Sequence, residues 1–115
     1  MPLLNIRTNQ PIQPGAQPDI LRVASALVAE LLEKPESYVM VTLQPETPIS
    51  FAGNQNPAAF LELHSLGLAE NKTRSLSAAL CQFTTTQLGI PPDRIYIRFE
   101  NPQRHMWGWN GSTFG

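Results

Sequence analysis

A chain of 115 residues, of which 42% are hydrophobic and 15% charged, suits one globular domain with a single core, which we expect to span residues 1–115. Eight basic and nine acidic residues leave a net charge of −1, which favours neither a nucleic acid nor an anionic membrane as a partner. A lone cysteine, Cys81, and the absence of zinc-ligand spacing argue against disulfide, metal and cofactor chemistry.

The first half of the chain predicts a strand, a helix and a second strand. LLNIRT, residues 3–8, has the alternation of a strand, and the proline-rich run after it predicts a loop. From Asp19 onward apolar residues recur at helical spacing until Lys34-Pro35 ends the pattern. The short β-branched run YVMVTL, residues 38–43, predicts the second strand.

The second half repeats this order. AFLELHSL, residues 59–66, predicts a strand, and Asn71 is a candidate cap for a helix that Gly89 and two prolines close. IYIRFE, residues 95–100, predicts another strand, and WGWNGSTFG forms a short aromatic carboxyl-terminal segment. In IYIRFE, alternation sends one set of side chains toward the helices and leaves the polar set, Tyr96, Arg98 and Glu100, in need of another partner.

A shift of 57 residues aligns the two halves. PLLNIRTN then falls on AFLELHSL, and KPESYVMV falls on PPDRIYIR. This indicates a duplicated β-α-β unit, in which right-handed crossovers make the strands of each unit parallel. The predicted fold class is therefore α+β, with one sheet and two helices on one face.

The amino-terminal segment lacks the basic stretch and long apolar run of a signal peptide, and no apolar stretch approaches the length needed to cross a bilayer. We expect a cytoplasmic protein without a membrane partner. Release from the cell without a signal peptide stays open.

Several motifs in fixed order resemble those of one family. They are Met-Pro at the start, TN-x-P from Thr8, KP-x-x-Y from Lys34 to Tyr38, FAGNQNPAAFLELHSLG, RIYI and the ending GWNGSTF. Together they resemble the macrophage migration inhibitory factor (MIF) family of the tautomerase superfamily over almost the whole chain. The resemblance implies the tautomerase/MIF fold, a homotrimer whose sheets surround a central channel, and active sites at the subunit interfaces.

The chemistry of Pro2 can be argued from the residues. A general base works best with a pKa near the operating pH, and a free terminal amine has a pKa of about 7.7 to 8.0. Burial against Leu3 and the carboxyl-terminal aromatic residues, or a nearby cation such as Lys34, would lower that pKa further. Taken alone, Pro2 is an ordinary second residue; with the family pattern it becomes the candidate base for proton transfer in a 2-keto acid.

The resemblance also supplies roles for other residues. Lys34 matches the lysine that holds the substrate carboxylate, although a cation in the last helical turn needs no further role. Leu66, beside Ser65, matches a position whose backbone N–H binds the same carboxylate, and Tyr96 matches a tyrosine contributed by a neighbouring subunit. The substrate pocket is expected to be completed by Tyr38, Trp107, Trp109 and Phe114.

Some positions depart from the family pattern. Well-known family members have asparagine at the position of Arg98. Arg98 either binds an acidic group of the substrate or pairs with Glu100 or with a carboxylate of a neighbouring subunit, and we favour the pairing. Trp107 replaces a smaller apolar residue and could narrow the pocket mouth. Ala58 and Leu61 replace the C-x-x-C pair of vertebrate relatives, so thiol oxidoreductase activity is not expected, and Cys81 reads as core.

Three classes of function follow. The favoured one is a cofactor-independent isomerase, a phenylpyruvate tautomerase-like enzyme with Pro2 and Lys34 as catalytic residues. The second is a cytokine-like protein that binds a receptor. The third is a ferredoxin-like RNA-binding domain, which the acidic balance and the missing glycine pattern oppose.

The favoured mechanism requires loss of Met1. While Met1 remains, the nitrogen of Pro2 is an amide whose lone pair is delocalised into the carbonyl, and it cannot act as a base. We therefore expect the active form to begin at Pro2.

Overall fold

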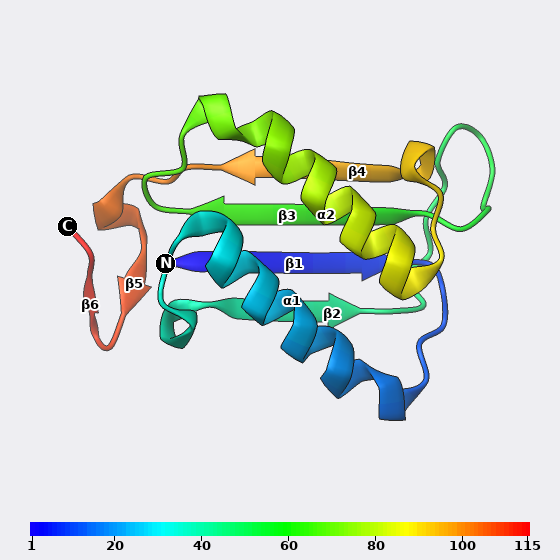
Figure 1. Ribbon diagram of the computed structural model, residues 1–115, viewed down its shortest axis with the longest axis horizontal. Coiled ribbons are helices and arrows are strands. Elements are labelled where there is room, and N and C mark those ends of the chain that lie inside the picture. The colour runs from blue at the N-terminus through cyan, green and yellow to red at the C-terminus, as the bar shows by residue number, and fades with distance from the viewer.

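The computed structural model describes residues 1–115 as two copies of a strand–helix–strand unit followed by a small hairpin (Figure 1). The first unit contains β1 (Pro2–Thr8), α1 (Gln17–Leu32) and β2 (Met40–Gln44), and the second contains β3 (Ala59–Ser65), α2 (Thr73–Leu88) and β4 (Ile95–Glu100). The hairpin consists of β5 (Gly108–Trp109) and β6 (Ser112–Thr113). No helix is both long and apolar enough to span a membrane.

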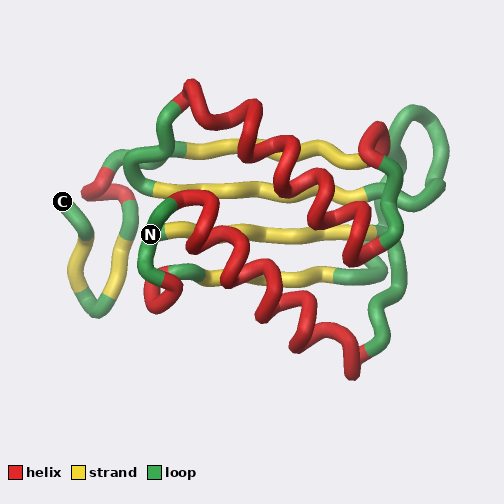
Figure 2. The backbone as a smooth tube through the Cα atoms, in the orientation of Figure 1, coloured by secondary structure: helices red, strands yellow, loops and turns green.

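The four long strands form one mixed sheet in the order β2-β1-β3-β4. Strands β1 and β2 are parallel, β3 and β4 are parallel, and the two units meet through the antiparallel pair β1–β3. Both helices lie on the same face of this sheet (Figures 1 and 2). The predicted α+β class, the duplicated unit and the placement of both helices are confirmed.

The duplication is visible in burial as well as in order. Strands β1 and β3 begin 57 residues apart, at Pro2 and Ala59, and alternate between buried and half-buried residues with the same phase. Thr8 and Ser65, which the sequence shift superimposes, both end their strands as buried polar residues. The repeat seen in the sequence is therefore a repeat of packing.

The core lies between the helices and the two central strands. Apolar residues on alternate positions of β1 and β3 turn toward the helices because side chains of a strand alternate between its faces. The helices contribute residues at helical spacing, so that one stripe of each is buried. The largest contributors are Leu4, Ile6, Leu61, Leu63, Ile20, Val28, Leu76, Leu80 and Phe83. As expected, Ile95, Ile97 and Phe99 of β4 pack against this core.

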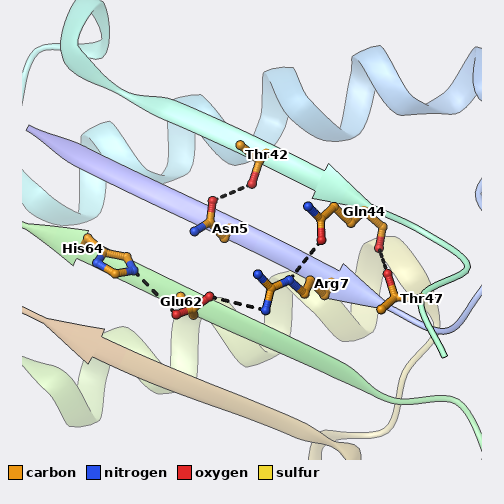
Figure 3. A network of polar contacts seen from close by, with 7 residues as sticks. All are labelled: Asn5, Arg7, Thr42, Gln44, Thr47, Glu62 and His64. Carbon is orange, nitrogen blue, oxygen red and sulfur yellow. Dashed lines mark hydrogen bonds and ion pairs between the residues drawn. The ribbon is translucent and has the colours of Figure 1, made fainter. Parts of the chain in front are cut away.

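The other face of the sheet is polar and uncovered. Arg7 donates through Nε to Oε1 of Gln44 at 3.0 Å, and its guanidinium lies 3.8 Å from Glu62, which in turn lies 3.7 Å from His64 (Figure 3). Beside them the Thr42 hydroxyl donates to the side-chain oxygen of Asn5. These contacts join three strands on a face that no element of the chain covers.

Two local expectations were wrong. Asn71 was expected to cap the second helix, but α2 begins at Thr73 without a side-chain cap. A 3-10 turn of residues Glu70–Lys72 precedes the helix, and the Thr73 N–H donates to the Glu70 carbonyl of that turn. Asn71 lies within that turn. Cys81 is half-buried and not part of the core cluster, since the buried stripe of α2 runs through Leu76 and Leu80 instead.

Arg94 and Asn9 both hold the loop between β2 and β3, and Arg94 makes three of these contacts. Arg94 donates to the backbone carbonyls of Phe51 at 2.8 Å, Asn56 at 2.8 Å and Pro57 at 3.1 Å, and its guanidinium carbon lies 4.9 Å from the centre of the Phe51 ring. That ring packs against Tyr96, with 4.6 Å between centroids. Arg94 therefore ties the long loop to the start of β4.

Replacing Arg94 by Gln should destabilise the protein by about 2 kcal/mol, because three carbonyls lose a charged donor. The measurement is thermal unfolding at fixed protein concentration, where the variant should melt several degrees lower. Arg74→Gln is the matched control, since Arg74 is exposed on α2 and makes no hydrogen bond or ion pair within the chain. Equal melting of the two variants would contradict this role of Arg94.

Candidate active site

The amino-terminal end of β1 is the centre of the candidate site. Because β1 is flanked by β2 and β3, the chain begins in the middle of the sheet, and the β5–β6 hairpin lies beyond the same end (Figure 1). Pro2 is the first residue of the strand and is fully buried. A proline is tolerated at the first residue of a strand because its missing N–H removes no bond from the middle of the ladder.

A pocket of about 300 Å³ opens at this end of the sheet. Its walls are mainly apolar, and they are contributed by the amino terminus, the segment before β2 and the carboxyl-terminal hairpin. The lining residues are Met1, Pro2, Leu3, Ser37, Tyr38, Val39, Met40, Trp107, Gly108, Trp109 and Phe114. The structure therefore brings together Pro2 and all four aromatic residues expected from the sequence.

The aromatic residues form one wall of the pocket. Tyr38 meets Trp109 edge to face, with 5.8 Å between ring centroids and 70° between planes. Phe114 stacks on the same tryptophan at 5.8 Å and 9°. Such a wall suits a flat apolar group, because aromatic rings favour both of these geometries.

The sequence folds the carboxyl-terminal segment into place through a tight turn. Asn110 and Gly111 both have positive φ, of 52° and 76°, as a two-residue hairpin loop of the Asn-Gly type requires. The turn pairs Trp109 with Ser112, and the Phe114 N–H donates to the Trp107 carbonyl at 3.2 Å. Two residues of the aromatic wall are thereby fixed by backbone contacts.

The terminal ammonium has a lowered pKa. Burial, followed by the positive charges of Lys34 and Arg104, lowers the pKa of the Met1 ammonium from 8.0. Each cause disfavours the protonated form, and together they favour a neutral amine at a lower pH than an ordinary terminus. Removal of Met1 would place the amine on Pro2, at the same end of β1.

Lys34 lies near enough to this amine for its charge to lower the amine's pKa. Lys34 was predicted from the sequence to lie in the last turn of the helix, and this was wrong, because the helix ends before it. α1 ends at Leu32, Glu33 adopts a left-handed conformation with φ of 54°, and the Lys34 N–H then donates back to the Ala29 carbonyl at 3.0 Å. This cap turns the chain toward the amino terminus. Lys34 itself is half-buried and makes no ion pair.

Ser65 and Leu66 lie next to Pro2 at the end of β3, the neighbouring antiparallel strand. Ser65 is the cross-strand partner of Pro2 in the β1–β3 ladder, and both residues are fully buried. The Ser65 hydroxyl has no hydrogen-bond partner, which is uncommon for a buried polar atom. Leu66 follows it and is also buried.

Tyr96 and Arg98 do not line the pocket. Tyr96 pairs with Phe60, which pairs with Arg7, so it lies toward the opposite end of the sheet from Pro2, and it is 65% exposed. Arg98 forms an ion pair of 2.7 Å with Glu100 on the uncovered face, which is one of the pairings expected from the sequence. A contact of either residue with a Pro2 pocket would require a second subunit.

Arg104 is the residue of this region that the sequence did not single out. It lies in a 3-10 turn of residues Arg104–Met106, directly before Trp107, and donates through Nε to the Phe114 carbonyl at 2.9 Å. An arginine in a run of mixed polar residues carries no periodic signal. Only the return of the hairpin to the start of β1 brings its charge near the amine.

Comparisons with known proteins agree with this geometry. The sequence profile described as "Macrophage migration inhibitory factor (MIF)" matches residues 1–115. A macrophage migration inhibitory factor homolog from Trichuris trichiura is 43% identical over 115 residues, covering 99% of this chain and 100% of that protein. The corresponding protein from Trichinella spiralis is 42% identical over 116 residues, with 99% and 100% covered.

Solved structures give the same result. The crystal structure of a macrophage migration inhibitory factor homologue from Prochlorococcus marinus has a TM-score of 0.92 at 45% identity, over 98% of this chain and 99% of that one. The fold is thus that of the tautomerase superfamily. The chain belongs to the macrophage migration inhibitory factor family, and the alternative of a ferredoxin-like RNA-binding domain is overturned.

The charges around the amine can be tested by titration. Lys34→Gln and Arg104→Gln should each raise the pKa of the terminal amine, because each removes a cation that disfavours its protonation. The measurement is the rate at which acetic anhydride modifies the terminal residue at different pH values, followed by mass spectrometry of the terminal peptide. Arg74→Gln should leave the titration unchanged, and an unshifted pKa in both test variants would contradict the assignment.

Proposed function

We propose that the protein is a cofactor-independent keto–enol tautomerase that acts on phenylpyruvate-like 2-keto acids, with the amine of Pro2 as general base after Met1 is removed. The observation that carries this proposal is the place of the chain start: Pro2 lines an aromatic pocket, and burial and two cations lower the pKa of the Met1 ammonium at this end of β1. After removal of Met1 the same surroundings would lower the pKa of the Pro2 ammonium, and a lowered pKa increases the neutral fraction of a base. Membership of the MIF family supports the same activity.

The proposed reaction moves one proton. The Pro2 amine removes a proton from C3 of the keto acid, the electron pair of that C–H bond forms the C2=C3 double bond, the C2=O π pair moves to oxygen, and that oxygen takes up a proton from water to give the enol. The Pro2 ammonium then returns its proton to water. In the reverse direction the enol O–H loses its proton to water, the C2=O bond re-forms, and the C2=C3 electron pair takes the proton of the Pro2 ammonium at C3. No oxidant, reductant or cofactor enters this balance.

The other site residues have binding roles in this proposal. The Lys34 ammonium, whose charge acts on the terminal amine, binds the substrate carboxylate. The backbone N–H of Leu66 donates a hydrogen bond to the same carboxylate. The unpartnered Ser65 hydroxyl offers a hydrogen bond beside Pro2. Tyr38, Trp109 and Phe114 hold the aromatic ring of the substrate, and Trp107 narrows the mouth of the pocket.

The proposed active form is a homotrimer with sites at the subunit interfaces. Tyr96 is large, exposed and remote from Pro2 within one chain, so it is available to a neighbour's site. The polar, uncovered sheet face agrees with sheets that surround a hydrated central channel (Figure 3). In this assembly Arg98 either stays paired with Glu100 or turns toward the neighbour's substrate.

A second candidate function is a cytokine-like one, in which the folded surface binds a receptor. It is supported by curated relatives, such as the protein from Mus musculus at 33% identity over 115 residues, that are named macrophage migration inhibitory factor. Macrophage migration measured with the wild type and with an inactive Pro2 variant would separate signalling from catalysis.

The role of Pro2 can be tested by changing what stands at the amino terminus. Intact mass should show loss of Met1, Pro2→Gly should remove most of the tautomerase rate, and one alanine inserted before Pro2 should abolish it. The rate should rise with pH as the Pro2 ammonium deprotonates, because only the neutral amine is a base. The pKa of this rise should lie below that of an ordinary terminus, because the burial and cations that lower the pKa of the Met1 ammonium lie at the same end of β1. Full activity in protein that retains Met1 throughout would exclude the mechanism.

The assembly can be tested by mixing inactive subunits. Light scattering should give three times the chain mass of 12.7 kDa. Pro2→Gly and Tyr96→Ala chains should each be nearly inactive alone but should recover activity when unfolded and refolded together, because some sites then combine an intact Pro2 with a neighbour's intact Tyr96. Random mixing of equal amounts should restore about a quarter of the sites. A monomer, or no recovery in mixed trimers, would contradict the interfacial site.

A further inference from the structure

Arg104 lies beside the carboxyl-terminal wall of the Pro2 pocket, and one hydrogen bond ties its side chain to that wall. Its Nε donates to the Phe114 carbonyl at 2.9 Å, and Phe114 is one of the two stacked rings of the pocket wall. The chain turns at Arg104–Met106 and enters the pocket wall at the next residue, Trp107. The two terminal nitrogens of the guanidinium make no hydrogen bond within the chain.

The charge of Arg104 is not balanced by an acidic side chain. Three other arginines, Arg7, Arg22 and Arg98, have a carboxylate within 4.0 Å, and Arg94 is satisfied by three carbonyls. Arg104 has neither arrangement. Among the arginines it is the one that combines a place beside the pocket with free terminal N–H groups.

Lys34 gives the same end of the sheet a second cation without an acidic partner. Lys34 follows α1 and Arg104 precedes the hairpin, so the two charges reach the amine from different segments. Figure 1 shows the hairpin segment and the amino terminus at the same end of the sheet. The end of the sheet that holds this mainly apolar pocket thus has two cations near the amine, one more than a single carboxylate needs.

We propose that Arg104 is a specificity-determining residue that binds a second acidic group of the substrate, so that the preferred substrates are 2-keto acids with another carboxylate away from the reacting carbon. This rests on the proposed function, in which Lys34 binds the first carboxylate. The planar fork of a guanidinium suits a carboxylate, and the bond from Nε to Phe114 fixes that fork before the ligand arrives. A ligand with one carboxylate leaves Arg104 in water and gains nothing from it.

The alternative role of Arg104 is to clamp the end of the chain. The backbone of Gly115 lies so close to this turn that an added Cβ would stand 2.8 Å from the His105 nitrogen and 3.1 Å from Arg104 Cβ. A clamp would support the aromatic wall equally for every substrate. The two roles therefore differ in whether a substitution of Arg104 discriminates between ligands.

The test compares 2-oxopentanoate with 2-oxoglutarate. Both are five-carbon 2-keto acids, and only 2-oxoglutarate has a second carboxylate, at the end of the chain away from the keto group. Deuterium exchange at C3, followed by proton NMR, gives kcat/KM for both with the full-length processed protein. The wild type should favour 2-oxoglutarate, and Arg104→Gln should reduce that preference about tenfold, chiefly through KM, as loss of one charged hydrogen-bonded contact predicts. Arg104→Lys should retain part of it, and Arg74→Gln all of it.

The outcomes separate this inference from the proposed function. If phenylpyruvate and both five-carbon acids fail to exchange with the wild type, the proposed tautomerase function is wrong. If they exchange but Arg104→Gln slows both five-carbon acids equally, Arg104 is a clamp and the inference is overturned. An unchanged ratio with unchanged rates overturns it as well.

Discussion

The antiparallel pairing of β1 with β3 is the constraint on which the site depends. It places the first strand in the middle of the sheet, with β2 bonded to its other edge, so the chain is paired with β3 from Pro2 and lies between two strands from Leu3 onward. Most chain termini are poorly ordered unless they are tied down in this way. A terminal amine at the end of a central strand is both rigid and partly desolvated, and desolvation is the first cause of its lowered pKa.

Patterns that repeat along the chain made most of this fold predictable. Alternation in LLNIRT and AFLELHSL, helical spacing after Asp19 and the shift of 57 residues were sufficient for strands, helices and duplication. The local errors arose where backbone contacts replaced a side-chain signal. Asn71 was expected to cap α2, but a preceding 3-10 turn already accepts the first N–H of that helix. Cys81 was expected in the core, but its place on α2 lies beside the buried stripe.

The site was predictable only in part, for a different physical reason. Pro2, Lys34 and the carboxyl-terminal aromatic residues were singled out through the family resemblance together with the chemistry of a terminal amine. Arg104 was missed because its nearness to Pro2 arises from the turn at Asn110-Gly111 and the return of Phe114, not from any spacing in the sequence. Tyr96 is the opposite case: the resemblance assigns it to the site, but it lies toward the far end of the sheet and does not line the Pro2 pocket of its own chain.

The helices cover one face of the sheet and leave the other face uncovered. The helices bury the alternate residues Leu4, Ile6, Leu61 and Leu63, so the side chains between them must face outward, and several of these are charged or amide-bearing. Such residues are already hydrogen-bonded or ion-paired with one another, and full burial would separate them from the water that satisfies their remaining groups. The proposed trimer, with this face toward a hydrated interior, would satisfy both requirements. Tyr96 lies on β4 beside β3 and has the same outward phase, so in the proposed assembly it would be available to another subunit.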